Sequence, residues 1–348
     1  MSVDSSPRQR ATILEVAEVA GVSKTSVSRY FGTERKRLSR SMQSRIAAAA
    51  ERLDYHPNQI ARGLKGGSSK LLGMLVADIR NRFSVEVLHG AEQACRDNGF
   101  SLMVCNTDND PQLEREHLAL LAAYRVEGLL INSTGQLSQE LQTLSRQGIP
   151  LVLLDRVLSD FDADLVGIDN NAAIDTAMDH LQQQGYRQVL YISEPPAQTS
   201  TRQARLERFR YRLLLDEWHG QALCLRLDEQ QGPLIESLKT FLDASNQGGG
   251  KAVLCANGNV TLAVTRALKS LAVPLGEVGL IGIDELDWCA LVGPGITTVA
   301  QPTDAIGRTA VESLLQRLDK ASSVVQARHI HYQPRLIERG STRLVPPA

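Results

Sequence analysis

The chain has 348 residues, of which 43% are apolar and 22% are charged, a composition typical of a soluble globular protein with two or three domains. The formal net charge is −1, but residues 1–70 hold 13 Lys and Arg against 6 Asp and Glu, a balance of +7, and the remaining residues hold 25 against 33, a balance of −8. No run of eighteen apolar residues occurs and the leader MSVDSSPRQRAT has no apolar segment, so membrane and secreted proteins are disfavoured and we expect a cytoplasmic protein.

The first seventy residues thus form a basic head on an acidic body. A basic segment is typical of proteins that contact nucleic acid, because neutralised phosphates supply much of the affinity. A solvated charged terminus is the alternative, and charge alone does not exclude it. The five scattered cysteines form no Cys-x-x-Cys pair, and we expect reduced, mostly buried thiols rather than disulfides or zinc ligands.

Two short helices joined by a tight turn are predicted near the start of the head. Thr12 is a good N-cap for the first helix, and Glu15 completes a capping box. Gly21 ends this helix, and Ser23 can cap a second one that runs to residue 31. This is the layout of a helix-turn-helix, whose second helix lies in the DNA major groove. Any small helical bundle is the alternative.

Hydroxyl and cationic side chains occupy the outward face of the second helix, and such side chains can bond to base edges and phosphates. The residues expected to contact DNA here are Thr12, Ser23, Lys24, Thr25, Ser26, Ser28 and Arg29. Val27 and Tyr30 are expected to face a small core, which a third helix over residues 39–53 completes. We therefore expect a helix-turn-helix domain over residues 1–54.

The stretch YHPNQIARGLKGG, within a predicted hinge over residues 55–69, contains a helix too short to be stable alone. Leu64 stands in it between Arg62 and Lys65, and an apolar side chain flanked by cations is what minor-groove proteins insert into a base step. A plain interdomain linker is the alternative. The residues of this stretch expected to contact DNA are Asn58, Ala61, Arg62, Leu64 and Lys65.

The body, residues 70–348, alternates short apolar runs with amphipathic helical stretches. Buried parallel strands read as continuous apolar runs, so the pattern predicts an α/β fold. Eleven strands are too many for one compact sheet, and two doubly wound parallel-sheet lobes fit better. The expected strands cover residues 71–76, 100–106, 128–132, 150–155, 164–169, 188–193, 222–227, 252–256, 278–284, 297–301 and 329–334.

Enzyme signatures are weak in this sequence. There is no Gly-x-Ser-x-Gly elbow, and GGGK at residues 248–251 lacks the earlier glycine and the following hydroxyl of a phosphate loop. His329 and His331 share one strand face, with no neighbouring ligand that would favour a metal site over a structural strand. We therefore expect no catalytic residues, no metal and no cofactor.

Two motifs carry a family resemblance. The head reads AT-I-x-x-V-A-x-x-AGVS-x-x-x-VSR and then L-x-Y-x-PN-x-x-A-R-x-L-K, with the spacing intact, and it resembles the lactose-repressor/galactose-repressor (LacI/GalR) family of bacterial transcription factors. The resemblance implies that Leu64 inserts at the centre of a palindromic, double-stranded operator held by a homodimer. It also implies that Lys24 and Thr25 are the main base-reading residues, with Arg29 behind them.

The resemblance further implies a periplasmic-binding-protein-like type I body. Its N-terminal lobe would cover about residues 71–168 and 300–327, and its C-terminal lobe about residues 169–299 and 328–340. Three crossovers would form a hinge, with a small-molecule effector in the cleft between the lobes.

Motif positions in the body imply the residues that contact the effector. RLERF matches the family's R-x-x-G-F segment, with Arg208 in place of the usual glycine; CANG matches A-x-N-D, with Gly258 in place of aspartate. For Asp155 and Arg156 a role in supporting the hinge is the alternative, and for Phe83 a role in lobe packing. The implied residues are Arg82, Phe83, Asp155, Arg156, Thr199, Thr201, Arg205, Asn257 and Asp284.

The arginines among these residues bear on the class of effector. Arginine suits bidentate capture of a carboxylate, and Arg82 beside Arg205 favours a sugar acid of the gluconate or ketogluconate type. A neutral sugar and a co-repressor mode remain alternatives within this family, and a solute-binding or sugar-modifying protein is the alternative outside it. No leucine heptad follows the last predicted strand, so we expect no C-terminal tetramerisation helix.

Overall fold

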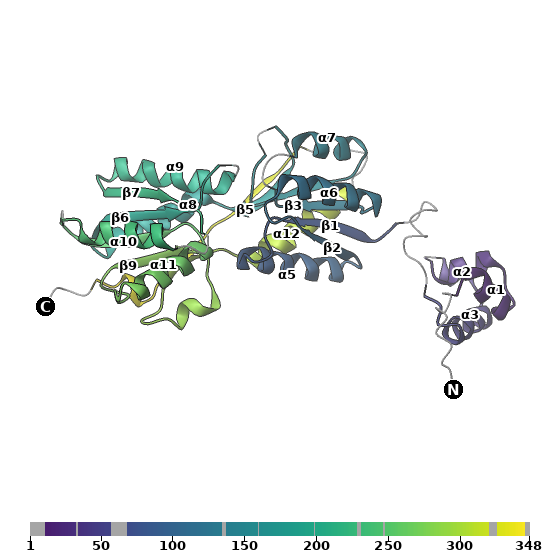
Figure 1. Ribbon diagram of the computed structural model, residues 1–348. Helices are drawn as coiled ribbons and strands as arrows, with labels where there is room; N and C mark the ends of the chain where they lie inside the picture. The colour runs from purple at the N-terminus through teal and green to yellow at the C-terminus, as the bar shows by residue number, and fades with distance from the viewer. Residues whose placement is uncertain are drawn as a thin grey trace. The chain divides into compact units, whose positions relative to one another are not determined.

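The computed structural model of the chain describes residues 11–32, 34–56, 68–133, 137–158, 160–197, 199–227, 231–245, 248–319 and 326–344. The chain divides into two compact units, Met1–Ser69 and Lys70–Ala348 (Figure 1). Within the described ranges, no helix is long and apolar enough to cross a membrane. All five cysteines are free thiols, and all except Cys224 are buried.

The described residues of the head form three α-helices and one 3-10 turn. These are α1 (Ile13–Ala20), α2 (Lys24–Tyr30), η1 (Arg35–Arg37) and α3 (Arg40–Arg52). The predicted capping box is present, since the Thr12 side chain accepts from the Glu15 backbone and Glu15 accepts from the Thr12 backbone. The helices expected from the cap residues are therefore confirmed, to within one or two residues at their ends.

The turn between α1 and α2 is fixed from outside as well as by its own sequence. Gly21 has φ 59°, a left-handed conformation that costs glycine little. The guanidinium of Arg45, on α3, donates to the carbonyl oxygens of Ala20 and Gly21 at 2.6–2.9 Å. These bonds satisfy carbonyls that the helix end leaves without a partner. The angle between the two helices is thereby set by the third.

The N-terminal lobe of the body contains a six-stranded parallel sheet in the order β11-β5-β4-β3-β1-β2. Its strands are β1 (Leu71–Val76), β2 (Ser101–Asn106), β3 (Gly128–Ile131), β4 (Leu151–Leu154), β5 (Asp164–Ile168) and β11 (His329–Tyr332). Its helices are α5 (Arg82–Asp97), α6 (Pro111–Ala123), α7 (Ser138–Arg146) and α12 (Thr303–Asp319). Helices α5 and α12 pack so closely that a Cβ at Gly307 would collide with the backbone of Val87.

The C-terminal lobe contains a second six-stranded sheet in the order β12-β10-β9-β8-β6-β7, in which only β12 is antiparallel. Its strands are β6 (Tyr186–Ser193), β7 (His219–Cys224), β8 (Gly250–Cys255), β9 (Gly279–Ile283), β10 (Thr297–Ala300) and β12 (Arg335–Ile337). Its helices are α8 (Asn170–Gln183), α9 (Ser200–Leu215), α10 (Gly232–Asp243) and α11 (Gly258–Ser270), with 3-10 turns η2 (Asp287–Ala290) and η3 (Gly340–Thr342). The two lobes lie side by side in Figure 1.

The chain crosses between the lobes after β5, after β10 and after β11. The third crossing comes later in the chain than expected, because residues 328–340 were all assigned to the C-terminal lobe. Strand β11 pairs with β5 of the N-terminal lobe, and only β12 joins the C-terminal sheet. An edge strand with an alternating exposure pattern reads the same in either sheet, so its apolar content could not decide which sheet it joins. The two-lobed α/β fold itself is confirmed.

Candidate functional site

Helix α2 presents the expected polar face to solvent. The side chains of Lys24, Thr25, Ser28 and Arg29 are exposed and lie on a single two-turn helix. Val27, on the opposite side, is fully buried in the core of the head. This face therefore combines hydroxyls and cations on one rigid element, which is the arrangement that base and phosphate contacts need.

Other predicted DNA contacts already have partners within the head. Ser23 caps α2 by accepting from the Ser26 backbone at 3.1 Å, and the two hydroxyl oxygens lie 3.0 Å apart. Arg29 Nε donates to Glu34 Oε2 at 3.2 Å. Thr12 serves as the N-cap of α1. The hinge residues Asn58, Ala61, Arg62, Leu64 and Lys65 lie outside the described residues.

A pocket lies between the lobes of the body, at the carboxyl ends of strands of both sheets, where ligands bind in open α/β folds. With its opening to solvent it encloses about 630 Å³. All the implied effector residues line it except Arg82. Its lining is Ala77, Asp78, Asn81, Phe83, Ser84, Asn109, Asn132, Asp155, Arg156, Glu194, Thr199, Thr201, Arg202, Arg205, Asn257, Asn259, Asp284 and Gln301.

The N-terminal lobe contributes an aspartate and an arginine, Asp155 and Arg156, which directly follow β4. Arg156 Nη1 donates to Asn109 Oδ1 at 3.3 Å and to the Ser133 carbonyl at 3.1 Å. Asp155 has φ 64°, in the left-handed region, which is uncommon for residues other than glycine but which aspartate adopts more readily than most. Burial raises the pKa of Asp155, against the opposing effect of the positive charges of Arg205 and Arg156.

In the C-terminal lobe, short hydrogen bonds hold the charged groups of Arg205 and Asp284 in place. Arg205, on α9, donates through Nε to Asn170 Oδ1 at 2.7 Å and through Nη1 to the Ala256 carbonyl at 2.6 Å. Asp284 accepts from the Gly258 backbone at 2.9 Å and from the Gln301 amide at 2.5 Å. These bonds fix a cation and an anion at the pocket wall before any ligand contact.

Three buried polar atoms in this pocket lack a hydrogen-bond partner among the described residues. They are Asp155 Oδ1, Arg156 Nε and Gln301 Oε1. A buried polar atom without a partner costs free energy, and a polar ligand that supplied the missing hydrogen bonds would recover it. The pocket is therefore suited to a small molecule with several hydroxyl or carboxylate oxygens.

Arg82, in contrast to the other implied effector residues, does not line this pocket. It lies on the first turn of α5 and pairs with Glu86 at 3.1 Å and with Asp287 of the other lobe at 3.1 Å. The second arginine beside Arg205 is instead Arg202, one turn earlier on α9, which sequence reasoning missed. Arg202 Nη2 donates to Glu194 Oε2 at 2.7 Å, and that oxygen also accepts from Asn257 Nδ2 at 2.8 Å.

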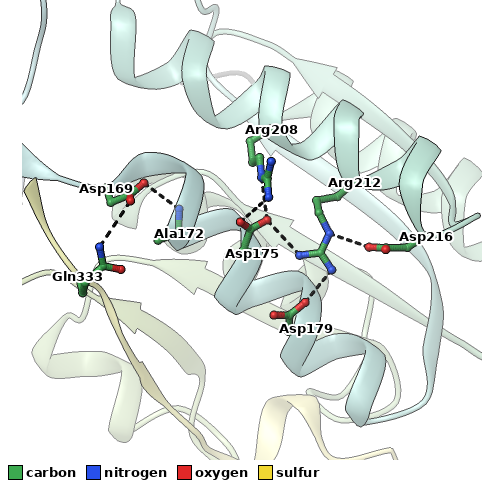
Figure 2. Close-up of polar contacts among 8 residues, drawn as sticks. All are labelled: Asp169, Ala172, Asp175, Asp179, Arg208, Arg212, Asp216 and Gln333. Atoms are coloured by element: carbon green, nitrogen blue, oxygen red, sulfur yellow. Dashed lines mark hydrogen bonds and ion pairs between the residues drawn. The ribbon is translucent and has the colours of Figure 1, made fainter.

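The family's usual glycine is replaced by Arg208, and the structure gives the substitution a role (Figure 2). Arg208 makes a bidentate pair with Asp175 of α8, at 2.8 and 2.7 Å. One turn later, the buried Arg212 contacts three carboxylates, those of Asp175, Asp179 and Asp216, at 2.6–3.0 Å. This cluster ties α9, which carries three pocket residues, to α8, which carries the partner of Arg205.

The residues that sequence reasoning missed include Asn109, Asn132, Glu194, Arg202 and Gln301. Each follows the carboxyl end of a strand or lies in the first turns of the next helix. That position, read over all the strands, is the signal that could have found them. No family motif covers these residues, so the resemblance alone does not single them out.

Comparisons with known proteins agree with this architecture. The family described as bacterial regulatory proteins, lacI family, matches residues 12–58, and the periplasmic binding protein-like domain matches residues 178–342. The HTH-type transcriptional regulator PtxS of Pseudomonas aeruginosa is 49% identical over 96% of both chains. The HTH-type transcriptional regulator KdgR of Bacillus subtilis is 37% identical over 95% of this chain and 97% of its own.

Solved structures agree at the level of the fold. The lac repressor dimer bound to operator and an anti-inducer superposes with a TM-score of 0.80, covering 97% of this chain and 100% of that chain at 22% identity. The close relatives are named as transcriptional regulators and not as enzymes, as expected from the sequence. The chain therefore belongs to the LacI family of bacterial regulatory proteins, and it is a DNA-binding transcriptional regulator with a periplasmic-binding-protein-like body.

Proposed function

We propose that the protein is a homodimeric repressor that binds a palindromic operator in the cytoplasm and leaves it when a sugar acid fills the interlobe pocket. The acid would be of the gluconate or ketogluconate type. The observation that carries this proposal is the pocket itself, which Arg156, Arg202 and Arg205 line together with three polar atoms that have no hydrogen-bond partner among the described residues.

Arginine content favours an acid over a neutral sugar. One pocket arginine would not discriminate, because a single guanidinium can also bond to sugar hydroxyls. Three arginines line this pocket, from α9 and from the segment after β4. Charge-assisted, bidentate capture of a carboxylate is what clustered arginines do best. Asp284 and Asn257 supply acceptors for the ligand's hydroxyl groups.

Release from DNA follows if the acid prefers one arrangement of the lobes. A ligand shifts such an equilibrium only by its difference in affinity for the two arrangements. Groups from both lobes line the pocket, so a ligand that contacts both can have such a preference. By the family resemblance, the arrangement of the lobes determines whether two hinge segments meet on the operator. Leu64 and its neighbours are the proposed link to the minor groove.

A thermal-shift screen tests the class of effector. Gluconate, 2-ketogluconate, glucose and a purine base are compared at matched concentrations, since a ligand that binds the folded state raises its melting temperature. We expect a rise with an acid and none with glucose. A rise with glucose and none with any acid would favour the neutral-sugar alternative.

An electrophoretic shift distinguishes induction from co-repression. The probe is a palindromic duplex selected by this protein from a randomised library. Loss of the slow-migrating complex on addition of the acid supports release, whereas a complex that forms only with the acid supports the co-repressor alternative.

A further inference from the structure

One of the pocket arginines, Arg202, is already paired with a carboxylate of the protein itself. Glu194, which directly follows β6, accepts from Arg202 Nη2 at 2.7 Å and from Asn257 Nδ2 at 2.8 Å, all through its Oε2 atom. The side chains of Glu194 and Arg202 are about equally exposed, at 21% and 23%. The pair thus lines the pocket and is reachable from it.

A second arginine faces the same region from the other lobe. Arg156 comes from the N-terminal lobe and Arg202 from the C-terminal lobe, and both line the pocket. Burial lowers the pKa of Arg156; the neighbouring Asp155 raises it, the positive charge of Arg202 lowers it, and the negative charges of Glu114 and Glu194 raise it. Among the described residues, Arg156 Nε is buried without a hydrogen-bond partner. Two arginines therefore line the pocket from opposite lobes, and Arg156 still has a donor without a partner among the described residues.

Building on the proposed function, we propose that the carboxylate of the sugar acid lies between Arg156 and Arg202, where it takes the place of Glu194 on Arg202. Because one Oε2 atom accepts from both Arg202 and Asn257, Glu194 must move when the ligand binds, and the Asn257 amide is the donor that can follow it. The hydroxyls of the ligand then face Arg205, Asp284 and Gln301. No covalent bond is made or broken, and one ion pair is exchanged for another.

This exchange explains how the pocket would select for charge. A neutral sugar has no anion with which to compete against Glu194, so it leaves the pair on Arg202 intact. An acid bonds to both cations and links the two lobes. The acid is therefore selected by charge-assisted hydrogen bonds that a neutral sugar cannot make.

The test uses three substitutions in the full-length protein, with binding measured by isothermal titration calorimetry. Arg202→Gln removes the charge but keeps an amide donor, and Glu194→Gln removes the competing charge but keeps an acceptor. Arg210→Gln is the matched control, because Arg210 is exposed on the same helix and does not line the pocket. Melting temperatures of all variants check that each is folded.

The expected results have opposite signs. R202Q weakens gluconate or 2-ketogluconate binding by about tenfold to a hundredfold, the value of one charge-assisted hydrogen bond. E194Q strengthens it severalfold, because the ligand no longer displaces a charged competitor. R210Q leaves the affinity unchanged.

Two results would overturn the inference and leave the proposed function standing. If the wild type binds the acid and R202Q binds it equally well, the carboxylate lies elsewhere in the pocket. If E194Q weakens acid binding, Glu194 is a ligand contact and not a competitor. A wild-type protein that binds none of the acids would overturn the proposed function, and this inference with it.

Discussion

Arg82 of the N-terminal lobe donates through Nη2 to Asp287 Oδ2 of the C-terminal lobe, at 3.1 Å. On the N-terminal side, Glu86 accepts from Arg82 Nε at 3.1 Å, and the Thr303 hydroxyl donates to Glu86 at 2.8 Å. Thr303 begins the helix that follows the second crossover between the lobes. Arg82, which the sequence suggested as an effector contact, therefore forms an ion pair that connects the two lobes.

A double-mutant cycle on Arg82 and Asp287 separates a role of Arg82 in connecting the lobes from a role in contacting the effector. If Arg82 acts through Asp287, then R82Q and D287N change acid affinity to a similar extent, and the double variant adds nothing further. Because both side chains are at least half exposed, the change should stay within about fivefold, equivalent to about 1 kcal/mol. A large loss with R82Q and none with D287N would restore Arg82 as an effector contact.

The α8–α9 cluster should stabilise the body. Arg212 is buried and contacts three carboxylates, so R212A removes a cation that all three share, and of the three only Asp175 keeps its pair with Arg208. We expect the free energy of unfolding to fall by about 3 kcal/mol, as for other buried pairs that lose one partner. Urea denaturation measures it, with R210A, on the exposed face of the same helix, as the control. Equal stability of the two variants would contradict the prediction.

The loss of folding stability at low pH should depend on Asp164, whose side chain is 1% exposed. Burial by itself raises the pKa of Asp164, but hydrogen bonds from Arg317 and Arg328 outweigh it and hold that pKa below its usual value. A carboxyl whose pKa is lower in the folded state contributes stability above its unfolded pKa of about 3.9, and this contribution is lost as the pH falls through the folded pKa.

The measurement is the free energy of unfolding as a function of pH for the wild type and D164N. Their difference should be largest near neutral pH, at about 3 kcal/mol, and should shrink below about pH 4. D162N is the control, since Asp162 is 75% exposed on the same stretch of chain. A difference that stays constant down to pH 2 would contradict the assigned role.

Glu34 should moderate DNA binding by the head. It pairs with Arg29 on α2 and also with Arg37, so it partly neutralises two cations near the recognition helix. E34Q is expected to strengthen binding to non-specific duplex DNA severalfold and to steepen its salt dependence by about one unit of slope for each additional phosphate that an arginine neutralises. Anisotropy titrations at several salt concentrations measure both, with E51Q on α3 as the control. An unchanged slope would mean that neither arginine binds a further phosphate.

The head was the most predictable part of the molecule. Thr12, Glu15, Gly21 and Ser23 are local signals whose effect does not depend on the rest of the fold, and each acts as predicted. The buried strands were likewise predictable from the sequence, because buried parallel strands are apolar along most of their length. Two edge strands were exceptions: β12 matches none of the eleven predicted strands, and β7 begins at His219, three residues before the predicted strand at 222. Its first residues are exposed on a sheet edge, so no apolar run marked them.

The site was predictable where a family motif or a loop next to one pointed to it. Arg205 and Asp284 came from such motifs, and both line the pocket. Arg202 was missed because its sequence neighbours do not distinguish it from other arginines of α9. Only the fold shows that it faces Glu194, while Arg208 and Arg212 face α8. Which partner an arginine finds is a tertiary property, and one-dimensional spacing does not encode it.

Release of the operator by a sugar acid can be measured on the preformed protein–operator complex. The complex is titrated with 2-ketogluconate and with gluconate, and the fluorescence anisotropy of the labelled DNA is followed. We predict that at least one of these acids lowers the anisotropy to that of free DNA, and that glucose at the same concentration leaves it unchanged. Anisotropy that stays high with every acid, or that falls equally with glucose, would contradict release by an acid bound between the lobes.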